Sequence, residues 1–206
     1  FMKIPSDGIP YPIFSYCALL PWTFFSTSML AGINSMTSNA SLIQQIYFPR
    51  IIFPLSAVMS SFVDFMIASI IFIGLLIFYK VQITIYVFFI IPILILQIVL
   101  AISVSMLGSA LNVFYRDIGQ GLLFITQLWM YACPIIYPIS VIPEKYRMLY
   151  ALNPMVGIID SYRKVIIQGI APNWDYLLIS FVVTALVFIS FYSIFTKLEM
   201  KLADII

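Results

Sequence analysis

Charged residues are rare in this chain, and five long segments lie between them almost free of charge. Four of these segments contain no Asp, Glu, Lys or Arg, and the other contains only Asp64. The segments are residues 8–49, 51–79, 81–115, 118–143 and 176–196. A helix needs about 20 apolar residues to cross the hydrocarbon core of a bilayer, and each segment supplies that many. The pattern predicts an all-α, polytopic integral membrane protein.

Composition excludes several kinds of chemistry. The chain has no His, so imidazole catalysis and His-ligated metals are excluded. Cys17 and Cys133 both lie in apolar segments, which favours small buried side chains over a metal site or a disulfide framework. The net charge of +2 gives no reason to expect a nucleic-acid partner. We therefore expect no metal site, no catalytic residues and no cofactor bound by this chain.

Turn residues and prolines divide the chain into five predicted spans within one transmembrane domain, residues 1–206. Their approximate bounds are 12–36, 51–78, 84–112, 119–137 and 176–196. Pro10, Pro12 and Pro21 make the beginning of the first span irregular. The third span is longer than a bilayer requires, so it is expected to tilt, to protrude or to kink at Pro92.

A short interfacial helix is predicted at residues 39–48. Leu42, Ile43 and Tyr47 recur at helical spacing, while Gln44 and Gln45 occupy the other face. The helix is open to two interpretations, a docking surface for a soluble partner or a connector lying on lipid headgroups.

Residues 144–169 are amphipathic and too charged to cross a membrane simply. Asn153 and Pro154 divide the segment into two halves, and Asp160 and Lys164 can pair at i,i+4 in the second half. Two short helices that enter the membrane and return would fit this pattern. Such re-entrant structure requires cover from protein or from a water-filled cavity.

Two groups of residues could carry function. Asp64 is the one ionisable side chain deep in a span, and it either couples transport to protons or makes a structural contact. Aromatic residues make up 17% of the chain and cluster near two spans. They either form an interfacial belt or line a pore whose rings contact the apolar faces of sugars. The clustered aromatics are Trp22, Phe24, Phe25, Trp129, Tyr131 and Tyr137.

No phosphate-binding sequence G-x-x-x-x-G-K-[ST] occurs in the chain, so it contains no recognisable ATPase site. If ATP powers this protein, a separate chain must bind the nucleotide.

Six groups of motifs, taken in order, resemble one known family. They are YP and LPWTFF at 11–12 and 20–25, IYFPR and FPL at 46–50 and 53–55, LNVFYRD at 111–117, PIIYP at 134–138, IPEK at 142–145 and LNPM at 152–155. Together they resemble the membrane (permease) subunit of polysaccharide-exporting ABC transporters, the O-antigen and teichoic acid exporters. The resemblance covers nearly the whole chain.

The resemblance implies a six-helix permease fold with re-entrant gate helices before the last span. Five spans fall in this chain, so it looks like a subunit that begins after its first span. The family also implies a homodimer with a channel between subunits, lipid-linked polysaccharide as substrate, and two copies of a separate ATPase that binds ATP and Mg. The expected location is the bacterial inner membrane, and the expected role is O-antigen export in lipopolysaccharide biosynthesis.

The resemblance also implies roles for individual segments. Residues 39–48 become a cytoplasmic coupling helix, with Gln44, Gln45, Tyr47, Phe48 and Arg50 contacting the ATPase. Residues 144–169 become the gate on the outer side, around Asn153, Pro154 and Met155. The six clustered aromatics become candidates for the channel lining.

The distribution of basic residues favours the opposite orientation from the one that the resemblance implies. With the C-terminal tail inside, the inner side carries Arg50, Arg116, Lys197 and Lys201. The outer side carries Lys3, Lys80, Lys145, Arg147, Arg163 and Lys164. Basic residues normally concentrate in the loops on the cytoplasmic side of the membrane. Four of the six outer residues belong to the amphipathic segment, and the resemblance decides for a tail inside.

Two other functions remain open. One is an ABC permease for a drug or a small lipid, which would need a lateral gate rather than a continuous channel. The other is a carrier or channel that works alone and uses Asp64 as its titrating group. The leading hypothesis is a permease subunit that makes and breaks no covalent bond.

Overall fold

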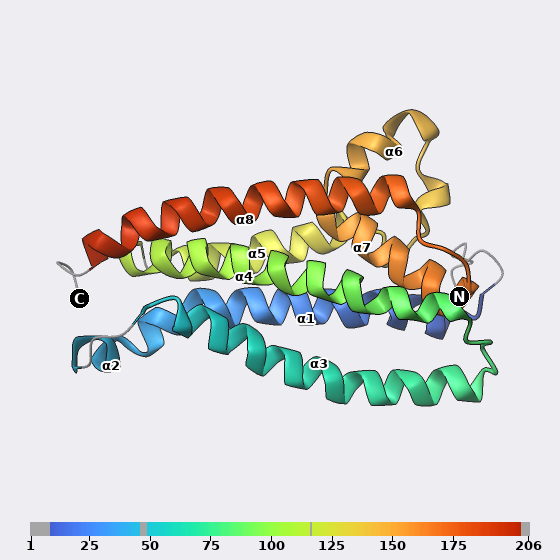
Figure 1. The fold of residues 1–206 in the computed structure, drawn as a ribbon, viewed down its shortest axis with the longest axis horizontal. Coiled ribbons are helices and arrows are strands. Elements are labelled where there is room, and N and C mark those ends of the chain that lie inside the picture. Colours follow the sequence, from blue (N-terminus) through green and yellow to red (C-terminus); the bar gives the residue numbers. More distant parts are fainter. Residues whose placement is uncertain (1–8, 46–48, 116, 203–206) are drawn as a thin grey trace.

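The structure is a computed structural model that describes residues 9–45, 49–115 and 117–202, and the regular structure in these residues is all helical (Figure 1). The elements are α1 (Tyr11–Ser38), α2 (Ala40–Gln45), α3 (Ile52–Phe78), η1 (Ile85–Phe89), α4 (Ile90–Phe114), α5 (Ile118–Tyr131), η2 (Ile139–Val141), α6 (Glu144–Ala151), α7 (Pro154–Tyr162), η3 (Arg163–Gln168) and α8 (Trp174–Leu202). The protein is an all-α membrane protein, as the sequence predicts.

Four helices in the described part of the chain are long and apolar enough to cross a membrane. They are α1, α3, the continuous stretch Ile85–Phe114 and α8. Helix α5 has 14 residues, which rise about 21 Å, less than the ~30 Å hydrocarbon core. Within the predicted span 119–137, the helix ends at Tyr131, and turns occupy the remaining residues, which include Pro134. This predicted span therefore does not form one helix long enough to cross the bilayer.

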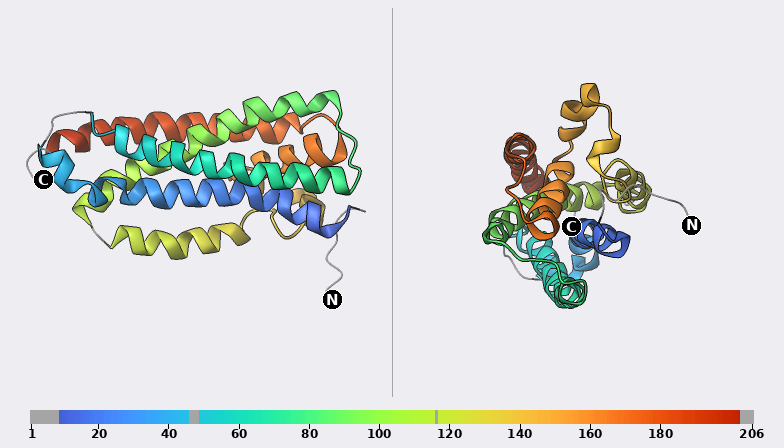
Figure 2. Two further views of the ribbon diagram at one scale, coloured as in Figure 1. Left: turned by 90° about the horizontal axis from the view of Figure 1, so that it is seen from below. Right: turned by 90° about the vertical axis from the view of Figure 1, so that its right-hand side faces the viewer.

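The long helices lie side by side along the long axis of the molecule (Figures 1 and 2). Helix α2 and the end of α8 lie at one end of the bundle. Helices α6 and α7 lie toward the other end, with the start of α8 (Figure 1). This arrangement places the predicted coupling segment and the predicted gate segment at opposite ends of the bundle.

Helix α1 packs between α3 and α4, and small residues allow a close approach to α4. A Cβ atom added at Gly32 would fall on the Ser105 side chain, and one added at Gly108 would fall on Ile33. Ser105 donates a hydrogen bond to the carbonyl of Ser28 at 3.2 Å. Helices in membranes commonly associate through small residues and hydrogen bonds of this kind.

The outward faces of α3 and α8 carry large apolar side chains, which include Ile67, Ile70, Phe181 and Ile189. In the most apolar stretch of α8, only 11% of the residues are buried against other parts of the chain. Such faces suit contact with lipid tails, which are as apolar as the side chains themselves.

Candidate channel and gate

Three of the predicted channel aromatics form one cluster between α1 and α5. The Trp129 ring lies 5.2 Å from Phe25 and 6.3 Å from Trp22, measured between ring centroids, in edge-on arrangements. Trp22 and Phe25 are buried within the chain, and Trp129 is half-buried. The cluster therefore joins the short helix α5 to the central helix α1.

The other predicted aromatics lie elsewhere. Phe24 is buried and packs against α3, with its ring centroid 5.2 Å from that of Phe65. Tyr131 is 61% exposed at the end of α5. The Tyr137 hydroxyl donates to the Tyr131 carbonyl at 2.9 Å and lies 3.0 Å from the Tyr150 hydroxyl. Of these six residues, Tyr131 has the most exposed position, while the three on α1 are buried in a single subunit.

Asn153 connects the aromatic cluster to the gate segment. Its Oδ1 accepts hydrogen bonds from the Trp129 indole and from the Met155 backbone N–H, both at 3.2 Å. Its Nδ2 donates to the Ala132 carbonyl at 3.1 Å. Asn153 thus caps α7, satisfying a donor that the first turn of a helix leaves free, and fixes α7 to the end of α5.

The rest of the predicted gate is built on this cap. Pro154 occupies the first position of α7, where its missing N–H costs nothing. Met155 is fully buried. Further along the helix, a Cβ atom at Gly157 would collide with Ser180 and the Tyr176 carbonyl of α8. Helix α7 is therefore seated closely against α8.

Arg163 is a buried cation whose role the sequence reasoning missed. Its guanidinium donates to the carbonyls of Pro134 and Ile135, the latter at 2.7 Å, and lies 3.7 Å from the centre of the Phe14 ring. These carbonyls belong to the turns that follow α5. Buried backbone carbonyls outside helices need donors, and one arginine provides several. The sequence offered one signal, a basic residue among the apolar positions Met155, Ile159, Tyr162 and Ile166, which recur at helical spacing.

The predicted pair of Asp160 and Lys164 is confirmed, with 3.4 Å between Oδ2 and Nζ. Burial raises the pKa of the Asp160 carboxyl above its ordinary value, and the Lys164 ammonium opposes that rise. Asp160 lies in α7, and Lys164 lies in the π-helical turn η3 that continues it.

Asn112 is a second residue whose role was missed, although it lies in the motif at 111–117. It donates to the Ile33 carbonyl and to the Asn34 Oδ1, both at 3.2 Å, and its Oδ1 accepts from the Gly119 N–H at 3.0 Å. This buried amide therefore holds together α1, the end of α4 and the first turn of α5.

At the opposite end from the gate, α2 covers 40–45 of the predicted coupling helix 39–48. Gln44 and Gln45 lie in α2, whereas Tyr47 and Phe48 fall outside the described residues. Arg50 lies between α2 and α3 and donates from Nη1 to the carbonyl of Glu199, in α8, at 2.7 Å.

Asp64 lies near the middle of α3 on its exposed face, and the described residues give it no ion pair. In this single subunit its carboxylate therefore faces outward from the bundle.

Comparison with known proteins identifies relatives over almost the whole chain. The family described as ABC-2 type transporter matches residues 3–167. The chain is 30% identical over 197 residues to the O-antigen export system permease protein RfbA of Klebsiella pneumoniae, covering 95% of this chain and 76% of that protein. A second K. pneumoniae protein of the same name is 29% identical with the same coverage. One from Myxococcus xanthus is 26% identical over 207 residues, covering 99% of this chain and 80% of that protein.

Proposed function

Because this chain belongs to the ABC-2 type transporter family, we propose that it is the channel-forming subunit of an ATP-driven exporter of lipid-linked polysaccharide. The substrate class includes O-antigen and polymers similar to teichoic acid or capsule. The subunit works as a homodimer in the bacterial inner membrane, with two copies of a separate ATPase. This chain supplies the path, and the partner binds ATP and Mg.

The observation that carries the proposal is the 30% identity, over 95% of this chain, to a protein named as an O-antigen export permease. The geometry supports it, because Asn153 ties the gate segment directly to α5 and its aromatic cluster. A path and a gate joined in this way suit a substrate that passes along the subunit.

One exposed stripe of α5 is suited to line the channel. Phe124, Leu128 and Tyr131 follow at helical spacing and are 69%, 70% and 61% exposed. Gln120 and Gln127 are exposed beside them. An amide side chain is costly to place against lipid tails but is suited to a water-filled lumen. Aromatic rings offer weak contacts to the apolar faces of sugars, which a moving polymer can exchange. The proposal therefore places this stripe toward the substrate, and Tyr131 is its one member among the six aromatics predicted from the sequence.

The energy of ATP would act on the subunit at the end of the bundle that carries α2, opposite the predicted gate (Figure 1). ATP binding brings the halves of the partner ATPase together and pushes on the coupling segment 39–48. The push drives transport only if the partner binds one channel state more tightly than the other. The contact between Arg50 and Glu199 offers a route from the coupling segment to the last span.

Deletion of the gene in its native host tests the function. We expect loss of the surface polysaccharide and accumulation of the lipid-linked polymer inside the cell, both restored by the wild-type gene. Normal surface polymer in the deletion strain would reject polysaccharide export and favour a permease for a drug or small lipid.

Purification from detergent-solubilised membranes tests the partner. The wild type is expected to co-purify with a nucleotide-binding chain and ATPase activity, and a Tyr47→Ala, Phe48→Ala variant is expected to recover less of both. A wild type that transports after reconstitution alone, and loses transport on Asp64→Asn, would identify a stand-alone carrier instead.

A further inference from the structure

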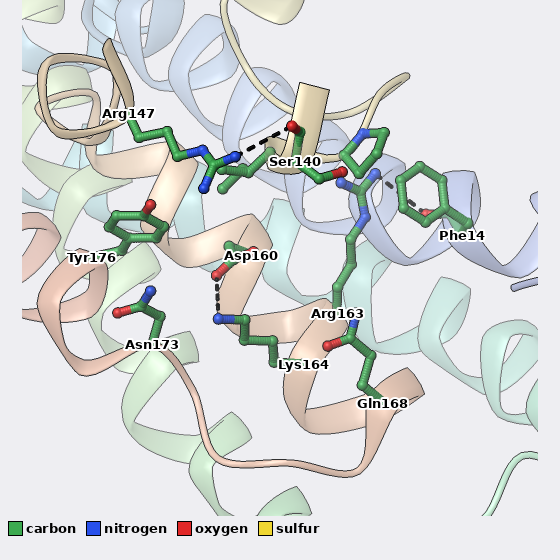
Figure 3. A pocket seen from close by; sticks show the side chains of 11 residues that line it. Phe14, Ser140, Arg147, Asp160, Arg163, Lys164, Gln168, Asn173 and Tyr176 are labelled. Atoms are coloured by element: carbon green, nitrogen blue, oxygen red, sulfur yellow. Dashed lines mark hydrogen bonds and ion pairs between the residues drawn. The ribbon is translucent and has the colours of Figure 1, made fainter. Parts of the chain in front are cut away.

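A polar pocket lies between α6, α7 and the start of α8, at the gate end of the bundle (Figure 3). Its cavity volume is about 260 Å³, slightly below the ~300–1,000 Å³ of typical small-molecule sites. The residues that matter for its chemistry are Arg147, Asp160, Arg163, Lys164, Asn173 and Tyr176. A space of this size suits a headgroup rather than a saccharide repeat.

Positive charge dominates the lining. Three cations, Arg147, Arg163 and Lys164, face one carboxylate, Asp160, which leaves a net charge of +2. Glu144 approaches Arg147 from outside the pocket, and including it still leaves +1. A cleft with an excess of positive charge in its lining raises the local concentration of anions.

Two of the cations, Arg147 and Lys164, keep N–H donors that form no hydrogen bond within the described part of the chain. Arg147 uses Nε and Nη2 for the carbonyls of Ile142 and Ser140, while its Nη1 lies 3.6 Å from Glu144, longer than a hydrogen bond. A guanidinium carries five N–H donors and an ammonium three, and Lys164 directs its Nζ toward Asp160. Asn173 accepts a bond through Oδ1 from the Asp175 N–H, which leaves its amide hydrogens as donors.

The depth of the pocket matches the headgroup layer of a bilayer. Helix α8 is a candidate span that begins at Trp174, and Tyr176, two residues later, lines the pocket. Trp174 is 57% exposed. Trp and Tyr concentrate where the hydrocarbon core meets the headgroups. The pocket therefore lies near the level of lipid phosphates.

We propose that this pocket binds a phosphate or diphosphate group, held by Arg147 and Lys164 with the amide of Asn173 as a neutral donor. Arginine matches the oxygens of a phosphate through its planar fork, and lysine adds a compact charge. The site goes beyond the proposed function, because binding requires neither the ATPase nor the polymer.

Binding to the purified full chain in detergent tests the site with two probes. The first is inorganic diphosphate, measured by calorimetric titration. The second is phosphatidylglycerol against phosphatidylcholine, measured as lipid retained in native mass spectrometry. Arg147→Gln and Lys164→Gln should each weaken binding roughly tenfold. Lys145→Gln, which removes an exposed charge from the same helix α6, should leave binding unchanged.

Asp160→Asn separates this proposal from a purely bracing role of the charges. The substitution removes the competing carboxylate and frees the Lys164 ammonium, so anion binding should tighten several-fold. If the charges only brace the helices, the same variant would lose thermal stability and gain no affinity. Should Lys164→Gln fail to fold, Arg147→Gln decides, because its side chain is 29% exposed on a short helix.

The two probes also identify the source of the phosphate. Retention of phosphatidylglycerol without diphosphate binding assigns the site to a lipid headgroup. Binding of diphosphate as well assigns it to phosphate groups in general. A folded wild type that binds neither probe, or an equal loss in Lys145→Gln, overturns the proposal.

Discussion

Arg50 and Glu199 are 149 positions apart in sequence, yet two hydrogen bonds join them. The Arg50 backbone N–H donates to Oε1 of Glu199 at 3.2 Å, and its Nη1 donates to the Glu199 carbonyl at 2.7 Å. The contact fixes the start of α3 to the last turns of α8. It lies directly after the predicted coupling segment 39–48, on which the proposed ATPase would act.

Loss of the Arg50 side chain should uncouple ATP hydrolysis from export. Arg50→Ala removes the bond to the Glu199 carbonyl, so we expect several-fold less polymer exported per ATP hydrolysed. The measurement is the ratio of exported polymer to phosphate released in reconstituted vesicles. Lys197→Ala, an exposed basic residue two positions from Glu199, is the matched control. Equal ratios in both variants would exclude this route.

Asn153 should prove important for both the stability and the closure of the gate. Asn153→Ala removes the α7 cap and the Trp129 partner, which should cost about 0.5–2 kcal/mol of stability. Asn153→Asp keeps an accepting oxygen at the start of α7, where a negative charge is favourable, but replaces the donor to the Ala132 carbonyl with a carboxylate oxygen, so it should lie between alanine and wild type. Thermal melting in detergent measures stability, and solute leakage from vesicles measures closure. Alanine and aspartate variants that behave alike would contradict the capping role.

Asn112 should be needed for the packing of α1, α4 and α5. Asn112→Leu leaves the Gly119 N–H without its side-chain acceptor, and an unpaired buried group costs about 1–3 kcal/mol. A lower melting temperature in detergent is the expected result. Asn34→Ala, which removes one of the three groups that Asn112 bonds on α1, should have a smaller effect. A larger loss of melting temperature in Asn34→Ala than in Asn112→Leu would place the centre of this network on α1 instead.

The exposed stripe of α5 should affect export without affecting stability. Phe124→Ala removes a ring that is 69% exposed, so little packing is lost, but the proposed contact with the polymer would disappear. We expect reduced export and an unchanged melting temperature. Phe181→Ala on the outward face of α8, where the ring is 60% exposed, is the control and should export normally. Equal export by both variants would argue that α5 faces lipid.

Local sequence signals were sufficient for part of this structure. Four of the five charge-poor segments contain helices of spanning length, because the bilayer excludes charge whatever the neighbours are, whereas the segment 118–143 contains only the 14-residue α5. The spacing of Asp160 and Lys164 predicts their pairing because i and i+4 share a helix face. Both predictions depend on residues close together in the chain.

The parts that were not predictable depend on distant residues. The sequence does not distinguish the three neighbouring aromatic residues Trp22, Phe24 and Phe25. Only the positions of α3 and α5 decide which rings each of them contacts. The turns after α5 at Pro134 and Ile135 are stabilised by Arg163, nearly 30 positions later. Helical periodicity contains no information about either relationship.

The position of Arg163 has a mechanical consequence. One side chain links the turns after α5 with Phe14 near the start of α1, from its own place in η3. Separating any one of these segments from the others would leave the buried Arg163 guanidinium without some of its hydrogen-bond partners, which is energetically costly. We therefore expect these segments to move together, as one unit, in any opening movement of the subunit.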